Sequence, residues 1–222
     1  MEPRLTEISA NQALLYLGYK GGGIPEDVDA AIARCSRVIL DTARPRAVYK
    51  LFPWDPDRPL RGTEFTPGGR DIRKLLRESH HVILFGATLG SEIEQLLRRA
   101  QVRDMADAVV LDCCASAAIE NVCDNLCTDL QAELDGYLTD RFSPGYGDFP
   151  FAQQPEFCRV LDMSRRIGVN LTPGGLMIPQ KSVTALMGVA DRPQPMRFRG
   201  CAYCSQFETC VYRREGASCG RV

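Results

Sequence analysis

The sequence predicts an α+β fold with a long central helix and a cysteine-rich C-terminal tail. Helical and strand patterns are mixed along the 222 residues, without the strict β-α-β alternation that is typical of parallel-sheet proteins. Residues 104–134 contain no glycine or proline and are rich in Ala, Leu, Asp and Glu, which predicts one long helix. Residues 81–85 form a short, β-branched apolar run, which is typical of a buried strand.

Before the long helix, periodicity and turn residues predict six elements. Apolar side chains at helical spacing indicate helices, and prolines and glycines mark where elements begin or end. In chain order we expect a helix over residues 5–17, a helix opening at Pro25, a strand over residues 47–52, a helix through Leu75 and Leu76, the strand over residues 81–85 and a helix around Ile93.

After the long helix, residues 141–150 form a loop that contains Gly, Pro and three aromatic residues. Pro155 is expected to begin a helix that stops at Gly168. Residues 171–178 and 182–189 flank a Pro-Gln-Lys turn, and this pattern predicts a pair of strands. The chain therefore divides into residues 1–190 as one domain and residues 191–222 as the tail.

Composition and charge exclude several classes of protein. Hydrophobic residues make up 45 % and charged residues 25 %, as in an ordinary globular protein. The formal net charge of -1 provides no overall basic field for nucleic acid or an anionic membrane. No apolar run approaches the ~18–20 residues that span a bilayer, and the N-terminus has no apolar signal-peptide core. We therefore expect a cytoplasmic protein with neither nucleic acid nor membrane as a partner.

Ten cysteines are unusual for a chain in a reducing compartment, where disulfides are rare. Cys113, Cys114, Cys123 and Cys127 fall within the predicted long helix. We interpret these four as small apolar packing residues, because free cysteine is among the residue types most often buried.

The last four cysteines, Cys201, Cys204, Cys210 and Cys219, predict a metal site with the spacing C-x2-C-x5-C-x8-C. A Cys-x-x-Cys pair forms a tight chelating turn, and four thiolates suit either zinc or an iron–sulfur cluster. The spacing matches neither the bacterial ferredoxin run nor a zinc ribbon of two such pairs. The choice between an iron–sulfur cluster and zinc therefore stays open.

The loop that begins at Arg141 is the most informative candidate binding segment. Arg141 offers a forked donor for a carboxylate, and Gly145 allows the backbone to approach a ligand closely. Tyr146 supplies a flat amphipathic surface. Taken alone, these residues are as consistent with a surface loop held by aromatic packing as with a binding loop.

At this loop the chain resembles the reactivation domain of cobalamin-dependent methionine synthase, and especially the stand-alone bacterial relatives of that domain. The family pattern Arg-x-x-Pro-Gly-Tyr stands here as Arg141-Phe-Ser-Pro144-Gly145-Tyr146. The similarity covers most of residues 10–190, and its further segments are Leu14-Leu-Tyr-Leu-Gly-Tyr-Lys-Gly21, Ala87-Thr-Leu-Gly90, Ala115-Ser-Ala-Ala-Ile-Glu120, Ile167-Gly-Val-Asn-Leu-Thr172 and Met177-Ile-Pro-Gln-Lys-Ser-Val183.

The resemblance implies a twisted antiparallel sheet flanked by helices, with a shallow site for S-adenosylmethionine. It implies that Arg141 holds the methionine carboxylate and that the backbone around Ser143 and Gly145 contacts the nucleoside. Tyr146 would then lie between this cofactor and the corrin ring. The acids that match the family pattern are Asp135 and Glu120, which would accept hydrogen bonds from the ammonium or ribose of the ligand. A charge-paired structural role for Glu120 is the alternative.

The resemblance also implies a function. Reactivation domains support the reductive methylation of cob(II)alamin: a donor such as flavodoxin or ferredoxin supplies one electron, and S-adenosylmethionine supplies the methyl group. A cobalamin-carrying Asp-x-His-x-x-Gly motif is impossible here, because the two histidines are adjacent, at 80 and 81. We therefore expect a component of methionine synthase activity, rather than an independent enzyme, that acts in trans on a separate corrinoid protein. The alternative is a non-catalytic, metal-binding docking or regulatory protein of a corrinoid methyltransferase system.

Overall fold

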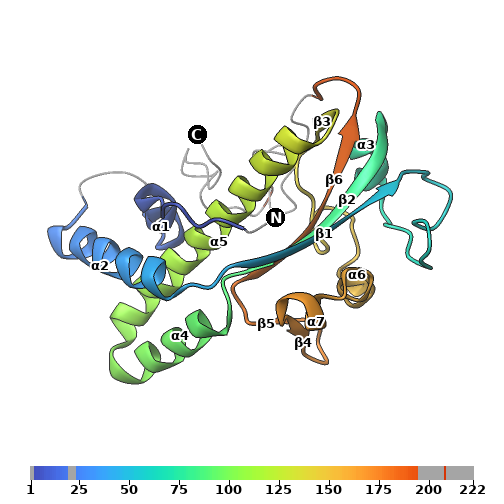
Figure 1. The fold of residues 1–222 in the computed structure, drawn as a ribbon. Coiled ribbons are helices and arrows are strands. Elements are labelled where there is room, and N and C mark those ends of the chain that lie inside the picture. The colour runs from blue at the N-terminus through green and yellow to red at the C-terminus, as the bar shows by residue number, and fades with distance from the viewer. Residues whose placement is uncertain (1–2, 20–23, 195–207, 209–222) are drawn as a thin grey trace.

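The computed structural model describes residues 3–19, 24–194 and 208. Within them the chain forms a four-stranded antiparallel sheet with helices on both faces, which confirms the predicted α+β class (Figure 1). The strand order is β1-β2-β6-β3. These strands span Arg46–Pro53 (β1), Ser79–Thr88 (β2), Tyr137–Leu138 (β3) and Ser182–Ala190 (β6). Each neighbouring pair is antiparallel.

One face of the sheet is covered by the long helix α5 (Met105–Glu133), which confirms the helix predicted over residues 104–134. Asp104 caps its N-terminus by accepting hydrogen bonds from the backbone N–H groups of Ala106 and Asp107. Three further helices pack on α5: α1 (Ala10–Tyr16), α2 (Glu26–Thr42) and α4 (Ser91–Arg103). Together with the sheet they enclose the first hydrophobic core.

The opposite face carries a second hydrophobic core. The helices on this side are α3 (Arg70–Leu75), α6 (Gln154–Leu161) and α7 (Met163–Ile167), and a short 3-10 helix, η1 (Phe151–Gln153), leads into α6. Phe142 and Phe149 join this core from the loop after β3. Their rings are stacked, with centroids 6.5 Å apart, and therefore anchor both ends of the loop.

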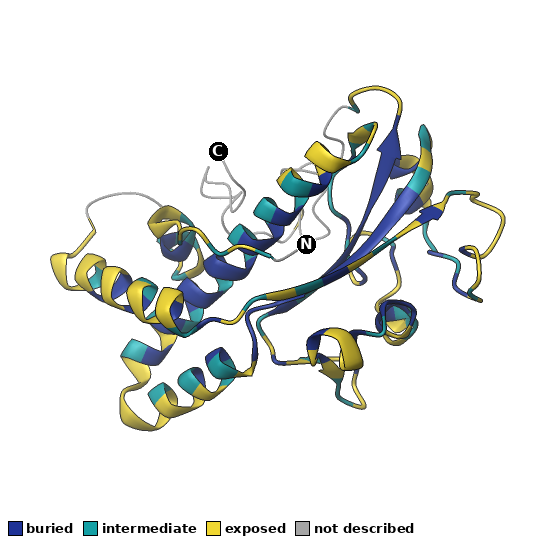
Figure 2. Ribbon diagram, viewed as in Figure 1, coloured by how far each residue is buried: buried dark blue, intermediate teal, exposed yellow. Residues whose placement is uncertain are grey.

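Strands β2 and β6 are shared by both cores, and they are buried along almost their whole length (Figure 2). Burial on both faces explains why residues 81–85 read as a continuous apolar run rather than an alternating one. The strand is longer than predicted, because Gly86, Ala87 and Thr88 continue it. No helix among the described residues has the length and apolarity needed to cross a lipid bilayer.

Two predictions of local structure were wrong. Residues 171–178 and 182–189 do not pair with each other: the first range forms a small hairpin of β4 (Asn170–Leu171) and β5 (Met177–Ile178), whereas β6 pairs with β2. The physical reason is that β6, apolar on both faces, is stabilised more by central burial between two cores than by a local hairpin. The helix expected from Pro155 to Gly168 is interrupted at Asp162, whose left-handed backbone (φ 54°) ends α6 and begins α7.

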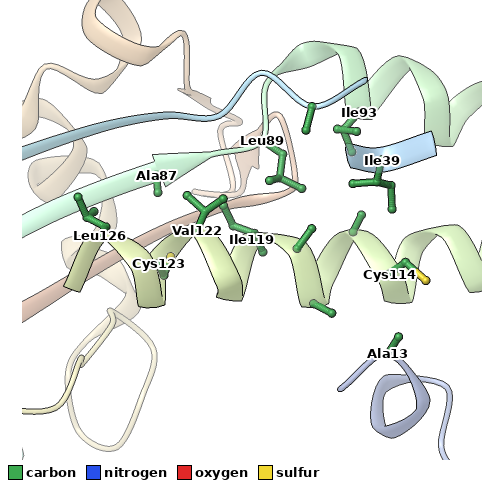
Figure 3. Packing of buried hydrophobic residues seen from close by; sticks show 14 of the residues in the cluster. Ala13, Ile39, Ala87, Leu89, Ile93, Cys114, Ile119, Val122, Cys123 and Leu126 are labelled. Carbon is green, nitrogen blue, oxygen red and sulfur yellow. The ribbon is translucent and has the colours of Figure 1, made fainter. Parts of the chain in front are cut away.

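The cysteines of α5 pack as predicted. Cys113, Cys114 and Cys123 are buried and Cys127 is half-buried. Figure 3 places Cys114 and Cys123 on α5 among the apolar side chains of the first core. Burial raises the pKa of the Cys114 thiol to about 11 and raises that of Cys123 further. Both side chains are therefore neutral thiols at physiological pH, which are poor metal ligands.

Candidate functional site

Arg141 lies beside the long helix because the segment before it follows the edge of β6. Thr139 donates its backbone N–H to the carbonyl of Gly188, at 3.0 Å. Phe142 exchanges two backbone hydrogen bonds with Leu186, at 2.9 and 2.8 Å. These contacts hold Arg141, which sits between the two anchor points, against the side of the sheet that α5 covers.

The Arg141 guanidinium binds two carboxylates of α5. Its Nη2 lies 2.8 Å from Oε2 of Glu120 and 3.0 Å from Oδ1 of Asp124. Glu120 and Asp124 are four residues apart, so they share one face of the helix. The Arg141 side chain is only 18 % exposed. The structure thus pairs Arg141 with Glu120, as in the charge-paired alternative for Glu120, and adds Asp124, which sequence reasoning missed.

Asp124 could have been found from its spacing. A second acid one turn after Glu120 on a predicted helix reaches the same partner, and an arginine can bind two carboxylates at once. Asp135 is instead exposed in the turn between α5 and β3. Among the described residues, no hydrogen bond or ion pair connects Asp135 to Arg141.

The electrostatics of this cluster keep Arg141 charged. Burial alone would lower the pKa of the Arg141 guanidinium. At the high pH where arginine titrates, Cys123 and Cys127 would be ionised, and together with Glu120 and Asp124 they outweigh burial and raise that pKa. The guanidinium therefore stays protonated over the whole physiological range, and with both carboxylates ionised the cluster carries a net charge of −1.

One end of the Arg141 guanidinium, its buried Nη1, has no hydrogen-bond partner among the described residues. A buried donor without a partner costs stability, and in native structures such groups are uncommon. An acceptor supplied by a ligand would satisfy it.

A pocket of about 430 Å³ opens at Arg141, between α5 and the strands β3 and β6. Its walls include Asp124, Cys127 and Thr128 of α5, and Met187 of β6. The volume falls within the ~300–1,000 Å³ range of small-molecule sites. Of the cofactor-binding residues expected from the sequence, Arg141 lines this pocket. Glu120 does not line it but pairs with Arg141, and the other expected residues, Asp135, Ser143, Gly145 and Tyr146, do not line it either.

The loop after Arg141 folds into a compact turn. The Tyr146 N–H donates to the Ser143 carbonyl at 3.0 Å, and the Gly145 N–H donates to the Phe149 carbonyl at 2.9 Å. Gly145 has a φ of 92°, a left-handed conformation that favours glycine. The turn leaves Tyr146 68 % exposed at the surface of the protein.

The predicted metal ligands Cys201, Cys204, Cys210 and Cys219 lie outside the described residues. In the described part of the chain, no cluster of three or more His, Cys, Asp or Glu side chains could hold a metal ion. The metal site of the tail therefore stays a prediction.

No protein-family model matches this chain, and no curated protein sequence matches it either. Among solved structures, the chain is similar to the crystal structure of the MetH reactivation domain bound to AdoHcy, with a TM-score of 0.53. The match covers 87 % of this chain and 72 % of that chain, at 16 % sequence identity. This likeness establishes that the chain has the fold of the MetH reactivation domain.

Proposed function

We propose that this protein binds S-adenosylmethionine at Arg141 and acts in trans to reactivate a corrinoid methyltransferase such as methionine synthase. The observation that carries the proposal is the buried, unpartnered Nη1 of Arg141, a residue that lines a pocket and whose guanidinium two carboxylates hold in place. The shared fold with a domain bound to AdoHcy supports the same ligand class. The segment from Arg141 to Tyr146 supports it independently, at the level of sequence.

The charges of the cluster complement the methionine end of the ligand. Arg141 Nη1 would donate to the ligand carboxylate, and Glu120 or Asp124 would accept from its ammonium group. S-adenosylmethionine carries a further positive charge on sulfur, which gives the molecule a net charge of +1. A cluster of net charge −1 would therefore bind S-adenosylmethionine, with its sulfonium, more tightly than the product, whose sulfur is a neutral thioether after methyl transfer. This difference in affinity would help the product dissociate.

A group of exposed apolar side chains, which begins in the loop after Arg141, is suited to a partner. Tyr146, Phe151 and Leu176 are 68 %, 45 % and 65 % exposed. A Cβ at Gly145 would lie 3.4 Å from Phe151, and one at Gly175 would lie 3.1 Å from the same ring, so the three apolar side chains belong to neighbouring segments. Exposed apolar side chains that gather in one place are typical of interaction surfaces. We infer that this patch faces the corrinoid protein and that Ser143 and Gly145 contact the nucleoside through their backbone.

The contribution of this chain to the reaction would be positional. S-adenosylmethionine would supply the methyl group, the corrinoid of the partner would accept it after one-electron reduction, and this chain would hold the donor in line with its acceptor. The tail cysteines Cys201, Cys204, Cys210 and Cys219 would hold an iron–sulfur cluster or zinc. An iron–sulfur cluster at these cysteines would relay the electron to the corrinoid. Visible absorption of the anaerobically purified protein would favour such a cluster, and stoichiometric zinc in a colourless protein would refute this relay role.

Calorimetric titration of the anaerobically purified protein with S-adenosylmethionine tests the proposal, with Arg141→Gln as the variant. Loss of a charge-assisted hydrogen bond costs about 1.5–3 kcal/mol, so we expect affinity to fall by about tenfold or more. Arg165→Gln is the matched control, because Arg165 is 82 % exposed, is paired to Asp162 and does not line the pocket. Equal binding by the wild type and the Arg141 variant would refute the proposed site.

A further inference from the structure

A second pocket, of about 490 Å³, lies where β1 begins beside the end of α7. Its walls carry three arginines, Arg44, Arg46 and Arg166, together with apolar surface from residues that include Ala47 and Ile167. It shares no lining residue with the Arg141 pocket. The helix α7 lies on the side of the sheet opposite α5 (Figure 1), and α7 contributes two residues to this pocket, whereas α5 contributes several residues to the Arg141 pocket.

The arginines of this pocket are not neutralised by the protein. Arg44 donates through Nη1 to the backbone carbonyls of Asp41 and Ala43, at 3.0 and 2.8 Å, and so caps the end of α2. No carboxylate among the described residues forms an ion pair with any of the three, whereas the neighbouring Arg165 lies 2.6 Å from Asp162. The guanidinium groups of Arg46 and Arg166 have no hydrogen-bond partner in the described part of the chain.

Arg44, Arg46 and Arg166 are exposed, so water screens their mutual repulsion, and without carboxylate partners they offer three positive charges to an anion in the pocket. A carboxylate has only two oxygens to offer, whereas a phosphate monoester presents three acceptor oxygens and carries about −1.5 to −2 charges at pH 7. The planar donor fork of arginine matches phosphate geometry. The apolar wall formed by Pro3, Ala47 and Ile167 suits a ligand with an apolar body.

We propose that this pocket binds a small organic phosphate, at a site separate from Arg141. The probe that tests it is phenyl phosphate, which joins a phosphate to an apolar ring, titrated into the full chain by calorimetry at low salt. Benzoate has the ring with a carboxylate in place of the phosphate and should bind at least tenfold more weakly. Arg46→Gln and Arg166→Gln should each weaken the binding of phenyl phosphate by about tenfold, since each removes a charge-assisted contact.

Arg165→Gln is the matched control on the same turn of α7, and it should change the affinity less than twofold. An equal loss in this variant would mean that phosphate responds only to the general surface charge, which would overturn the proposal. Absence of saturable phenyl phosphate binding would overturn it as well. Binding of poly-glutamate without phenyl phosphate binding would replace it with a docking surface for an acidic protein. S-adenosylmethionine takes no part in these titrations, so their outcome does not depend on the proposed function.

Discussion

Replacing Arg141 by methionine would test whether the ion-pair cluster is formed in solution. Met keeps the apolar stem and removes the guanidinium, so Glu120 and Asp124 lose their common partner. The contacts of 2.8 and 3.0 Å are charge-assisted, and the three side chains are 18 %, 30 % and 37 % exposed. Such partly buried pairs fall between the ~0.2–1 kcal/mol of exposed pairs and the ~1.5–3 kcal/mol of charged hydrogen bonds in general.

We therefore expect Arg141→Met to lower the free energy of unfolding by about 2 kcal/mol, about 1 kcal/mol for each contact. In a chain of this size that corresponds to a fall of about 4–8 °C in the melting temperature. Urea denaturation followed by circular dichroism gives the free energy directly. In a double-mutant cycle with Glu120→Gln, the coupling energy should be about 1 kcal/mol.

The cluster also predicts the result of neutralising all its members. A variant with Arg141→Met, Glu120→Gln and Asp124→Asn has no unpaired charge and should be more stable than Arg141→Met alone. Arg165→Met is the control, since its exposed pair with Asp162 is expected to contribute less than about 0.5 kcal/mol. A coupling energy of zero between Arg141 and Glu120 would show that the reasoning about this cluster is wrong.

Two further perturbations follow from contacts away from the pocket. A Cβ at Gly188 would lie 2.1 Å from Ser79 Oγ, so Gly188→Ala should destabilise the protein by about 1–3 kcal/mol in urea denaturation. Hydrogen bonds from the side chains of Arg192, Gln194 and Arg77 lower the pKa of Glu78 from 4.5 to about 2. A lowered carboxyl pKa stabilises the native state above the unfolded value of 4.5, and this stabilisation is lost as the pH falls toward 2. Glu78→Gln should therefore flatten the dependence of melting temperature on pH in that window.

The Gly188 prediction has a control within the same chain, and the Glu78 prediction has a clear refuting outcome. Gly174→Ala should be tolerated, because its Cβ would find its nearest neighbour, Thr172 Oγ1, 3.9 Å away. If Gly188→Ala were no more destabilising than Gly174→Ala, the close packing of β6 on Ser79 would be disproved. For Glu78, an unchanged pH profile in the Gln variant would mean that other carboxylates account for acid unfolding.

Much of the fold could be predicted from local patterns. The long helix, the helix opening at Pro25 and the strand over residues 47–52 lie where the sequence indicates, because each depends on periodicity and on Gly or Pro boundaries nearby. The pairing of β6 with β2 could not be predicted this way, since those strands are about a hundred residues apart. A local turn beside a strand suggests a hairpin whether or not a distant strand offers better burial.

The candidate site, like the fold, could be predicted from the sequence only where it depends on local patterns. A motif such as Arg141 to Tyr146 is contiguous, so sequence alone could identify it. The partners of Arg141 depend on how α5 lies across the sheet, and in the sequence only the one-turn spacing from Glu120 separates the paired acid Asp124 from the exposed acid Asp135. That Nη1 of Arg141 is buried without a hydrogen-bond partner likewise depends on how the folded protein packs, so the sequence could not predict it.

Strands β2 and β6 contribute to both hydrophobic cores, and this shared position has a consequence for how the protein unfolds. Since β2 and β6 are the inner walls of both apolar clusters, neither cluster can be exposed to water while the other stays intact. The amide protons of these two strands should exchange with solvent only through global unfolding, and should be the slowest in the protein. A ligand held on the α5 side would then slow exchange on the α7 side too, because whatever stabilises the native state protects every group that needs global unfolding to exchange.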